Sequence, residues 1–131
     1  VYFNKLTKSE NVLNQDGEEI DYLKVTTEGP KPKSFAYCSD TAYFDKLADY
    51  IKCVDLLYCE TTFLEKDKDK ALSTLHSTTT DAANLANKGA VKQLLIGHFS
   101  SRYDDYSNFL KEVKVIFDNV ILSEEGKKIQ V

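Results

Sequence analysis

Three short apolar runs, separated by segments with helical spacing, constrain the fold of this chain most strongly. The middle run, residues 54–59, is almost continuously apolar, which is typical of a strand buried on both faces of a parallel sheet. Residues 35–39 and 91–96 form similar runs. A segment with helical spacing follows each run, the last over residues 103–117. This alternation predicts an α/β fold with a mixed sheet.

The two ends of the chain carry weaker patterns. Residues 1–14 predict one or two short strands, and residues 20–27 predict another strand after an Asp16-Gly17 turn. Near the other end, residues 120–122 and 128–131 predict closing strands on either side of a turn.

Composition limits the domain organisation and the classes of partner. A chain of 131 residues with 42% hydrophobic content is long enough for one domain, residues 1–131, and too short for two comfortable ones. The formal net charge of −4 argues against this chain alone gripping nucleic-acid phosphates. No apolar run is long enough to span a membrane. Cys38, Cys53 and Cys59 are expected to be reduced core thiols of a cytoplasmic protein.

Titratable side chains stand where the three central runs end. Asp40 follows the first run, Glu60 ends the second, His98 follows the third, and His76 precedes a helical segment. Because the carboxyl ends of parallel strands share one edge of a sheet, these side chains are expected within reach of one another. Asp and His are ligands suited to zinc or manganese. The residues alone leave alternatives open: a helix cap for Asp40, and a structural hydrogen bond for each histidine.

Four motifs, in order and with matching spacing, resemble the carboxyl-terminal half of ribonuclease Z, a tRNA 3′-processing endonuclease of the metallo-β-lactamase fold. They are FAYCSDT at 35–41, CETTF at 59–63, HST at 76–78 and GHFSSRY at 97–103. The resemblance covers about residues 17–131. It implies the second half of an αββα sandwich, with helices on one face of the sheet.

The resemblance also implies that this chain is a fragment. The family's His-x-His-x-Asp-His cluster lies upstream of Asp40, and the chain has no histidine before His76 and no methionine at all. The first half and most metal ligands are therefore expected to lie outside these residues. The sequence departs from the family pattern at two places. The family's His-Glu-Ala-Thr motif reads Cys-Glu-Thr-Thr at 59–62, without its histidine and alanine, and Ser101 stands where a proline is common before the arginine of the last motif.

Residue roles follow from the resemblance. Asp40 corresponds to the carboxylate that bridges two zinc ions, and His98 to the last histidine ligand. His76, oriented by Glu60, corresponds to an acid or electrostatic stabiliser at the leaving 3′-oxygen or the phosphate oxygens.

Arg102 could contact a substrate phosphate. The alternative for Arg102 is a surface ion pair with Asp104 or Asp105.

The implied function is zinc-dependent removal of the 3′ trailer from precursor tRNA, leaving a tRNA 3′-hydroxyl. The intact enzyme would use two zinc ions, whereas this chain alone is expected to bind none tightly and to be inactive. Asp40, without its metals, is then expected to turn to water or to a neighbouring donor such as the Thr41 amide.

Two other functions are possible: another dinuclear-zinc hydrolase of the same fold, or a non-catalytic α/β module used for dimerisation. An apolar sheet face without helices predicts association through a homodimer or the missing half.

Overall fold

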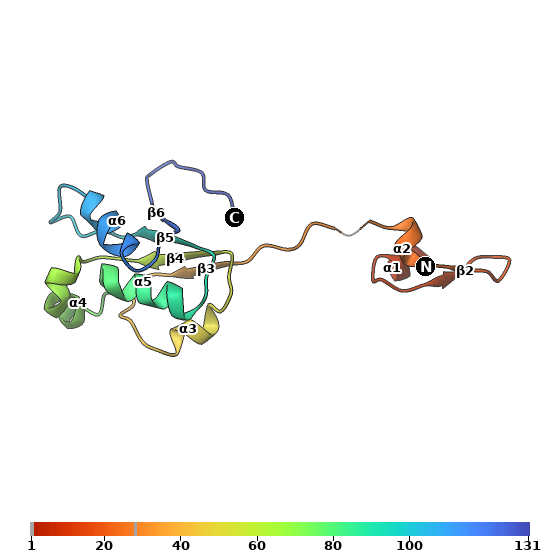
Figure 1. The fold of residues 1–131 in the computed structure, drawn as a ribbon, viewed down its shortest axis with the longest axis horizontal. Coiled ribbons are helices and arrows are strands. Elements are labelled where there is room, and N and C mark those ends of the chain that lie inside the picture. Colours follow the sequence, from red (N-terminus) through yellow and green to blue (C-terminus); the bar gives the residue numbers. More distant parts are fainter. Residues whose placement is uncertain (1, 28) are drawn as a thin grey trace. The chain divides into compact units, whose positions relative to one another are not determined.

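The computed structural model describes residues 2–27 and 29–131. The chain divides into two compact units, with the boundary between Pro32 and Lys33, and Figure 1 shows the fold of each. The sequence predicted one domain over residues 1–131. The four-stranded sheet and its helices lie within the second unit. No described helix is both long and apolar enough to cross a membrane.

The first unit is a hairpin flanked by two short helices. It contains α1 (Tyr2–Leu6), β1 (Val12–Leu13), β2 (Glu19–Ile20) and α2 (Tyr22–Val25), with β1 and β2 antiparallel. The predicted turn is confirmed, with Gly17 at φ +82°. The strand predicted over residues 20–27 is wrong beyond Ile20. The Asp21 side chain accepts the Leu23 N–H at 3.0 Å and so caps a helix.

The second unit is built on a four-stranded parallel sheet. Its strands are β3 (Phe35–Cys38), β4 (Leu56–Glu60), β5 (Gln93–Gly97) and β6 (Val120–Leu122), in the order β3-β4-β5-β6. The α/β class is confirmed. The mixed sheet is not, because all pairings among these four described strands are parallel and helical segments join successive strands. The strand predicted over residues 128–131 does not form.

Helices cover one face of this sheet (Figure 1). They are α3 (Leu47–Tyr50), α5 (Thr79–Lys88) and α6 (Ser107–Lys114). The helix α4 (Lys68–Thr74), preceded by the 3-10 turn η1 (Glu65–Asp67), contributes no residue to the described core of this face. The core joins α5 and α6 to alternate strand residues, namely Leu57, Cys59, Leu94, Ile96 and Val120 from the sheet and Ala82, Ala83, Leu85, Ala86, Phe109 and Val113 from the helices.

Two predicted helices are shorter than their sequence patterns. The helical segment predicted after residues 35–39 forms only over α3, Leu47–Tyr50. Before it, Tyr43 donates to Asp45 at 2.6 Å, and the Lys88 ammonium binds both side chains. The last helix begins at Ser107, whose N–H donates to the Asp105 carboxylate at 2.8 Å. Polar side-chain contacts thus accompany the shorter helices at both places.

The opposite face of the sheet carries aromatic side chains. Tyr37 and Tyr58 are paired in register and their rings stack with centroids 4.5 Å apart. Phe35 and Tyr37 are 53% and 65% exposed, so the accessible apolar surface of this face concentrates on β3. The next strands are better covered on this face, since Leu56 and Leu95 are buried.

The three cysteines are free, but they are not all core thiols. Cys38 and Cys59 are neighbours in the β3–β4 register and buried, and burial raises the pKa of both thiols. Cys53 is exposed, which corrects its prediction as a core residue. It lies in the turn between α3 and β4 with φ 59°, where no sheet covers it.

Candidate metal centre and catalytic site

The candidate site lies at the carboxyl ends of β3, β4 and β5. Asp40 stands two residues after the end of β3 and His98 directly follows β5, and both adopt left-handed backbone conformations, with φ of 48° and 64°. Asp and His tolerate this region better than most residues, and such conformations concentrate at functional sites. Leu75, at φ 59°, ends α4 in the same way and places His76 directly beyond the helix. Residues with left-handed backbone conformations thus help to place the side chains of Asp40, His76 and His98 at one rim of the sheet.

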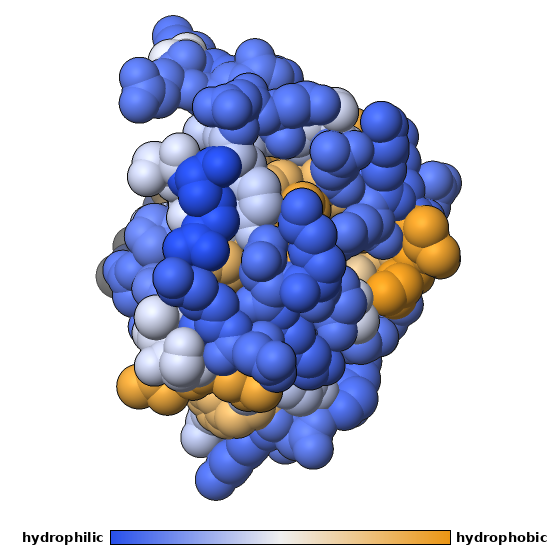
Figure 2. Space-filling view, turned by 90° about the vertical axis from the view of Figure 1, so that its left-hand side faces the viewer, coloured by the Kyte–Doolittle hydropathy of each residue, from blue (hydrophilic) through white to orange (hydrophobic). Residues whose placement is uncertain are grey.

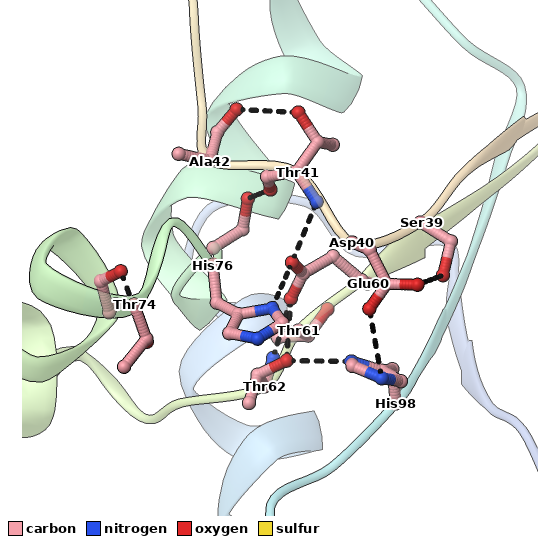
Figure 3. Close-up of polar contacts among 12 residues, drawn as sticks. Ser39, Asp40, Thr41, Ala42, Glu60, Thr61, Thr62, Thr74, His76 and His98 are labelled. Atoms are coloured by element: carbon pink, nitrogen blue, oxygen red, sulfur yellow. Dashed lines mark hydrogen bonds and ion pairs between the residues drawn. The ribbon is translucent and has the colours of Figure 1, made fainter.

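Glu60 is the buried centre of this site. Its side chain is 0% exposed, and Figure 3 shows the carboxylate between Thr41, Thr62 and His76. One oxygen accepts the Thr41 N–H at 3.1 Å and lies 2.7 Å from His76 Nδ1. The other accepts the Thr62 N–H at 3.1 Å and the Thr62 hydroxyl at 2.7 Å. Four partners compensate a carboxylate that would otherwise be costly to bury.

The contact with Glu60 orients the His76 ring. A carboxylate only accepts hydrogen bonds, so His76 Nδ1 is the donor in this contact, and in the neutral ring Nε2 keeps its lone pair. The neighbouring residues hold the backbone on either side. The buried Ser77 hydroxyl donates to the Thr41 carbonyl at 2.7 Å, and Thr78 caps α5 through a reciprocal bond with Asp81. Each residue of the His-Ser-Thr motif therefore has a separate structural task.

His98 and Asp40 form the more open part of the site. His98 Nε2 lies 3.2 Å from Asp40 Oδ1, and the two side chains are 41% and 70% exposed. On the other edge of the ring, His98 Nδ1 lies 2.9 Å from the Thr62 hydroxyl. Asp40 was expected to turn to water or to a neighbouring donor. The Thr41 amide is not that donor, because Glu60 accepts its N–H, whereas the Ser39 hydroxyl lies 3.5 Å from Asp40 Oδ2.

These donors fit a divalent zinc ion. One ligand atom from each of Asp40, His76 and His98 can be chosen so that all lie within 4.8 Å of one another. Two ligand atoms on a tetrahedral zinc, with bonds of about 2.0–2.2 Å, lie about 3.4 Å apart. The 3.2 Å between Asp40 and His98 matches that spacing. The sequence predicted a catalytic role for His76 and not a ligand role. The His76 ring centroid lies 5.3 Å from that of His98.

Arg102 lies one aromatic ring away from His76. Its guanidinium sits 5.0 Å from the Phe63 ring centroid, and Phe63 meets the His76 ring edge-on at 6.2 Å. Arg102 Nε donates to the Ser100 hydroxyl at 3.1 Å. Among residues 2–27 and 29–131, Arg102 forms no ion pair, so the expected alternative of a pair with a neighbouring aspartate is not observed.

Sequence reasoning missed the contribution of Thr62 and of the Thr41 amide. Thr62 bridges Glu60 and His98 with one hydroxyl. Its position two residues after Glu60, at the same strand end, was the available signal.

The surface around the strand ends is mainly hydrophilic, with small separate hydrophobic patches, on the side shown in Figure 2.

Sequence similarity relates the chain to known proteins. No protein-family model matches the chain. Ribonuclease Z from Parabacteroides distasonis is 42% identical over 127 residues, which cover 97% of this chain and 42% of that protein. Ribonuclease Z from Cytophaga hutchinsonii is 46% identical over 101 residues, covering 77% of this chain and 32% of the relative.

Two crystal structures share the fold. The metallo-β-lactamase fold protein YhfI from Bacillus subtilis is 25% identical with a TM-score of 0.63, over 70% of this chain and 37% of that one. Human tRNase Z, short form, is 30% identical with a TM-score of 0.52, over 71% and 30%.

The likeness to these structures shows that the fold is part of a metallo-β-lactamase fold. Within that class the chain is a homologue of ribonuclease Z, as the four sequence motifs predicted. It spans about two fifths of the length of the curated relatives it matches.

Proposed function

We propose that this chain is the carboxyl-terminal half of a zinc-dependent endoribonuclease that removes the 3′ trailer from precursor tRNA and leaves a tRNA 3′-hydroxyl. One observation carries the proposal: the buried Glu60–His76 pair, at 2.7 Å, lies beside the open Asp40–His98 pair, at 3.2 Å, in a homologue of ribonuclease Z. In this proposal residues 1–131 are one fragment of a domain and are inactive alone.

Asp40 and His98 are the proposed metal ligands of this half. Their carboxylate and imidazole atoms are accessible and adjacent, and both are ligands that zinc accepts. The intact enzyme would hold two zinc ions, with the remaining ligands supplied by the amino-terminal half. Bound zinc supplies charge stabilisation and a water of lowered pKa, which makes phosphodiester hydrolysis feasible at neutral pH.

His76 is the proposed catalytic acid or electrostatic stabiliser. Glu60 holds Nδ1 and so turns Nε2 toward the same rim as Asp40 and His98. A protonated Nε2 could donate to the leaving 3′-oxygen or to a phosphate oxygen. Since Glu60 is buried and held by three further donors, the ring cannot swing away without breaking a compensated buried contact.

Arg102 is the proposed contact for a substrate phosphate. Its stacking on Phe63 orders the guanidinium without neutralising it, which leaves its charge available for an anion. The Phe63 ring lies between Arg102 and His76. The expected partner of Arg102 is therefore a phosphate one or two nucleotides from the cleaved bond.

The exposed aromatic residues of β3 support association of this chain. Phe35 and Tyr37 would be covered by the amino-terminal half in the intact protein, or by a second copy in a homodimer. Sedimentation of the 131-residue chain tests this: we expect dimers or larger species at tens of micromolar, a concentration range that detects weak interfaces. A stable monomer at that concentration contradicts it.

Reduced cysteines are compatible with the proposed cytoplasmic location.

The function is tested by cleavage of a precursor tRNA that carries a 3′ trailer. The longer protein, comprising the upstream half and this chain, is expected to cleave it and leave a 3′-hydroxyl on the tRNA, while this chain alone leaves it intact. Lactam and thioester substrates, assayed in parallel, distinguish the alternative of another hydrolase of this fold, which the similarity to YhfI keeps open. Their turnover without tRNA cleavage would overturn the proposal.

A further inference from the structure

The Thr62 hydroxyl contacts both halves of the candidate site. Its oxygen lies 2.7 Å from Glu60 Oε2 and 2.9 Å from His98 Nδ1 (Figure 3). Thr62 is itself buried, with 6% of its surface exposed, so water does not compete freely for either contact. One side chain thus connects the Glu60–His76 pair with the Asp40–His98 pair.

A hydroxyl has one proton, and the geometry decides where it goes. Glu60 Oε2, as a carboxylate oxygen, can only accept, and charge-assisted hydrogen bonds at about 2.7 Å are the stronger ones. The Thr62 proton therefore points at Glu60. Only lone pairs of the Thr62 oxygen remain for the second contact, so His98 Nδ1 must be the donor there.

A competing contact on the other edge of the His98 ring is weaker. Asp40 Oδ1 lies 3.2 Å from Nε2 and would favour a proton on that nitrogen. Asp40, however, is 70% exposed and can turn to water at little cost, whereas Thr62 and Glu60 are buried and cannot. In the neutral ring the single proton therefore stays on Nδ1.

We propose that Thr62 is a positioning residue that holds His98 in the Nδ1–H tautomer and thereby presents the Nε2 lone pair to the Asp40 side of the site. The same carboxylate holds His76 in the corresponding tautomer. Glu60 thus sets both imidazoles, one directly and one through Thr62. Partners of this kind fix the ring orientation and donor atom of metal-binding histidines.

The inference deepens the proposed metal role of His98, but its test needs neither metal nor RNA. Long-range nitrogen–proton NMR of the metal-free chain, at a pH where imidazole is neutral, reports the tautomer of each histidine. Two histidines are present, and His76→Gln assigns their signals. We expect both His76 and His98 as Nδ1–H in the unchanged chain. An Nε2–H tautomer of His98 there overturns the proposal without any variant.

Variants separate positioning from simple packing. Thr62→Val keeps the shape and removes the hydroxyl, so His98 should lose the Nδ1–H tautomer in favour of Nε2–H while His76 keeps its own. Thr62→Ser retains the hydroxyl and should restore the parent spectrum. Thr61→Val is the matched control, because the buried Thr61 hydroxyl donates to the Cys59 carbonyl and touches neither histidine.

Two results would refute the role of Thr62: an unchanged His98 tautomer in Thr62→Val, or the same change in Thr61→Val. If Thr62→Val does not fold, the spectra of the unchanged chain and of Thr62→Ser still decide between the tautomers. Failure of the longer protein to cleave tRNA would instead count against the proposed function and leave these spectra valid.

Discussion

Replacing Glu60 by Gln probes the centre of the site with minimal change in shape. The carboxylate serves four partners, and the amide of Gln can accept with only one of its two terminal atoms. The Thr62 N–H and hydroxyl both need an acceptor, so the amide oxygen should remain on their side. The amide nitrogen then faces His76 Nδ1 and the Thr41 N–H.

The expected cost follows from that arrangement. His76 can accept from the new amide by moving its proton to Nε2, but the Thr41 N–H has no such alternative. An unsatisfied buried donor costs about 1–3 kcal/mol. The Thr41 N–H is part-buried, so Glu60→Gln should lower the free energy of unfolding by up to that amount. Glu60→Ala should cost more, because it leaves all four partners without the carboxylate and opens a cavity.

Urea unfolding of the 131-residue chain followed by circular dichroism measures these differences; the chain has no tryptophan for fluorescence. Glu124→Gln is the matched control, since its side chain is 64% exposed and changes there usually stay within about 0.5 kcal/mol. A Glu60→Gln loss no larger than that of the control would refute the reasoning, because it would mean that the buried carboxylate does not satisfy these donors. The His76 tautomer in Glu60→Gln gives a second, independent readout.

Three further outcomes are expected. In the longer protein, His76→Ala should lower single-turnover cleavage by about 100-fold or more with its zinc content retained; loss of zinc would identify His76 as a ligand instead. Zinc titration of this chain alone should show only weak binding, because Asp40 and His98 are exposed and ligands from the upstream half are absent, and a stoichiometric sub-micromolar site would contradict this. Asp55→Asn should be less stable than the parent near neutral pH, since the Lys92 ammonium and the Ser34 N–H hold the Asp55 pKa below its usual range. A lowered pKa contributes stability above the unfolded value, so urea midpoints of the two proteins should converge as the pH falls below about 4, and a constant difference would exclude this linkage.

Much of the fold could be predicted because the signals are local. The strand-length apolar runs placed β3, β4, β5 and β6 within about two residues of their observed bounds. The helical segment predicted after His76 is observed as α5, with Thr78 as its cap. Some predictions failed where a local side-chain cap redirects the chain, as Asp21 does before α2, and others where a contact between distant residues departs from the local pattern. The contacts of Lys88 with Tyr43 and Asp45 are an example of a contact between distant residues, because no pattern within residues 41–46 predicts them.

The sequence by itself determined the chemistry available to this protein: three apolar strands whose carboxyl ends carry Asp40, Glu60 and His98, and a histidine placed before a helix. Side-chain types and their positions relative to strand ends are local properties, so the motifs also predicted the relationship to ribonuclease Z.

Only the tertiary structure decided how those groups are connected. Which atom of Glu60 accepts from Thr41, and that Thr62 shares one hydroxyl between Glu60 and His98, depends on strand register and on left-handed turns at Asp40 and His98. A shift of one residue in register would turn every side chain of a strand to the other face of the sheet. Hydrogen-bond partners are set by such sub-ångström placement, which no sequence spacing encodes.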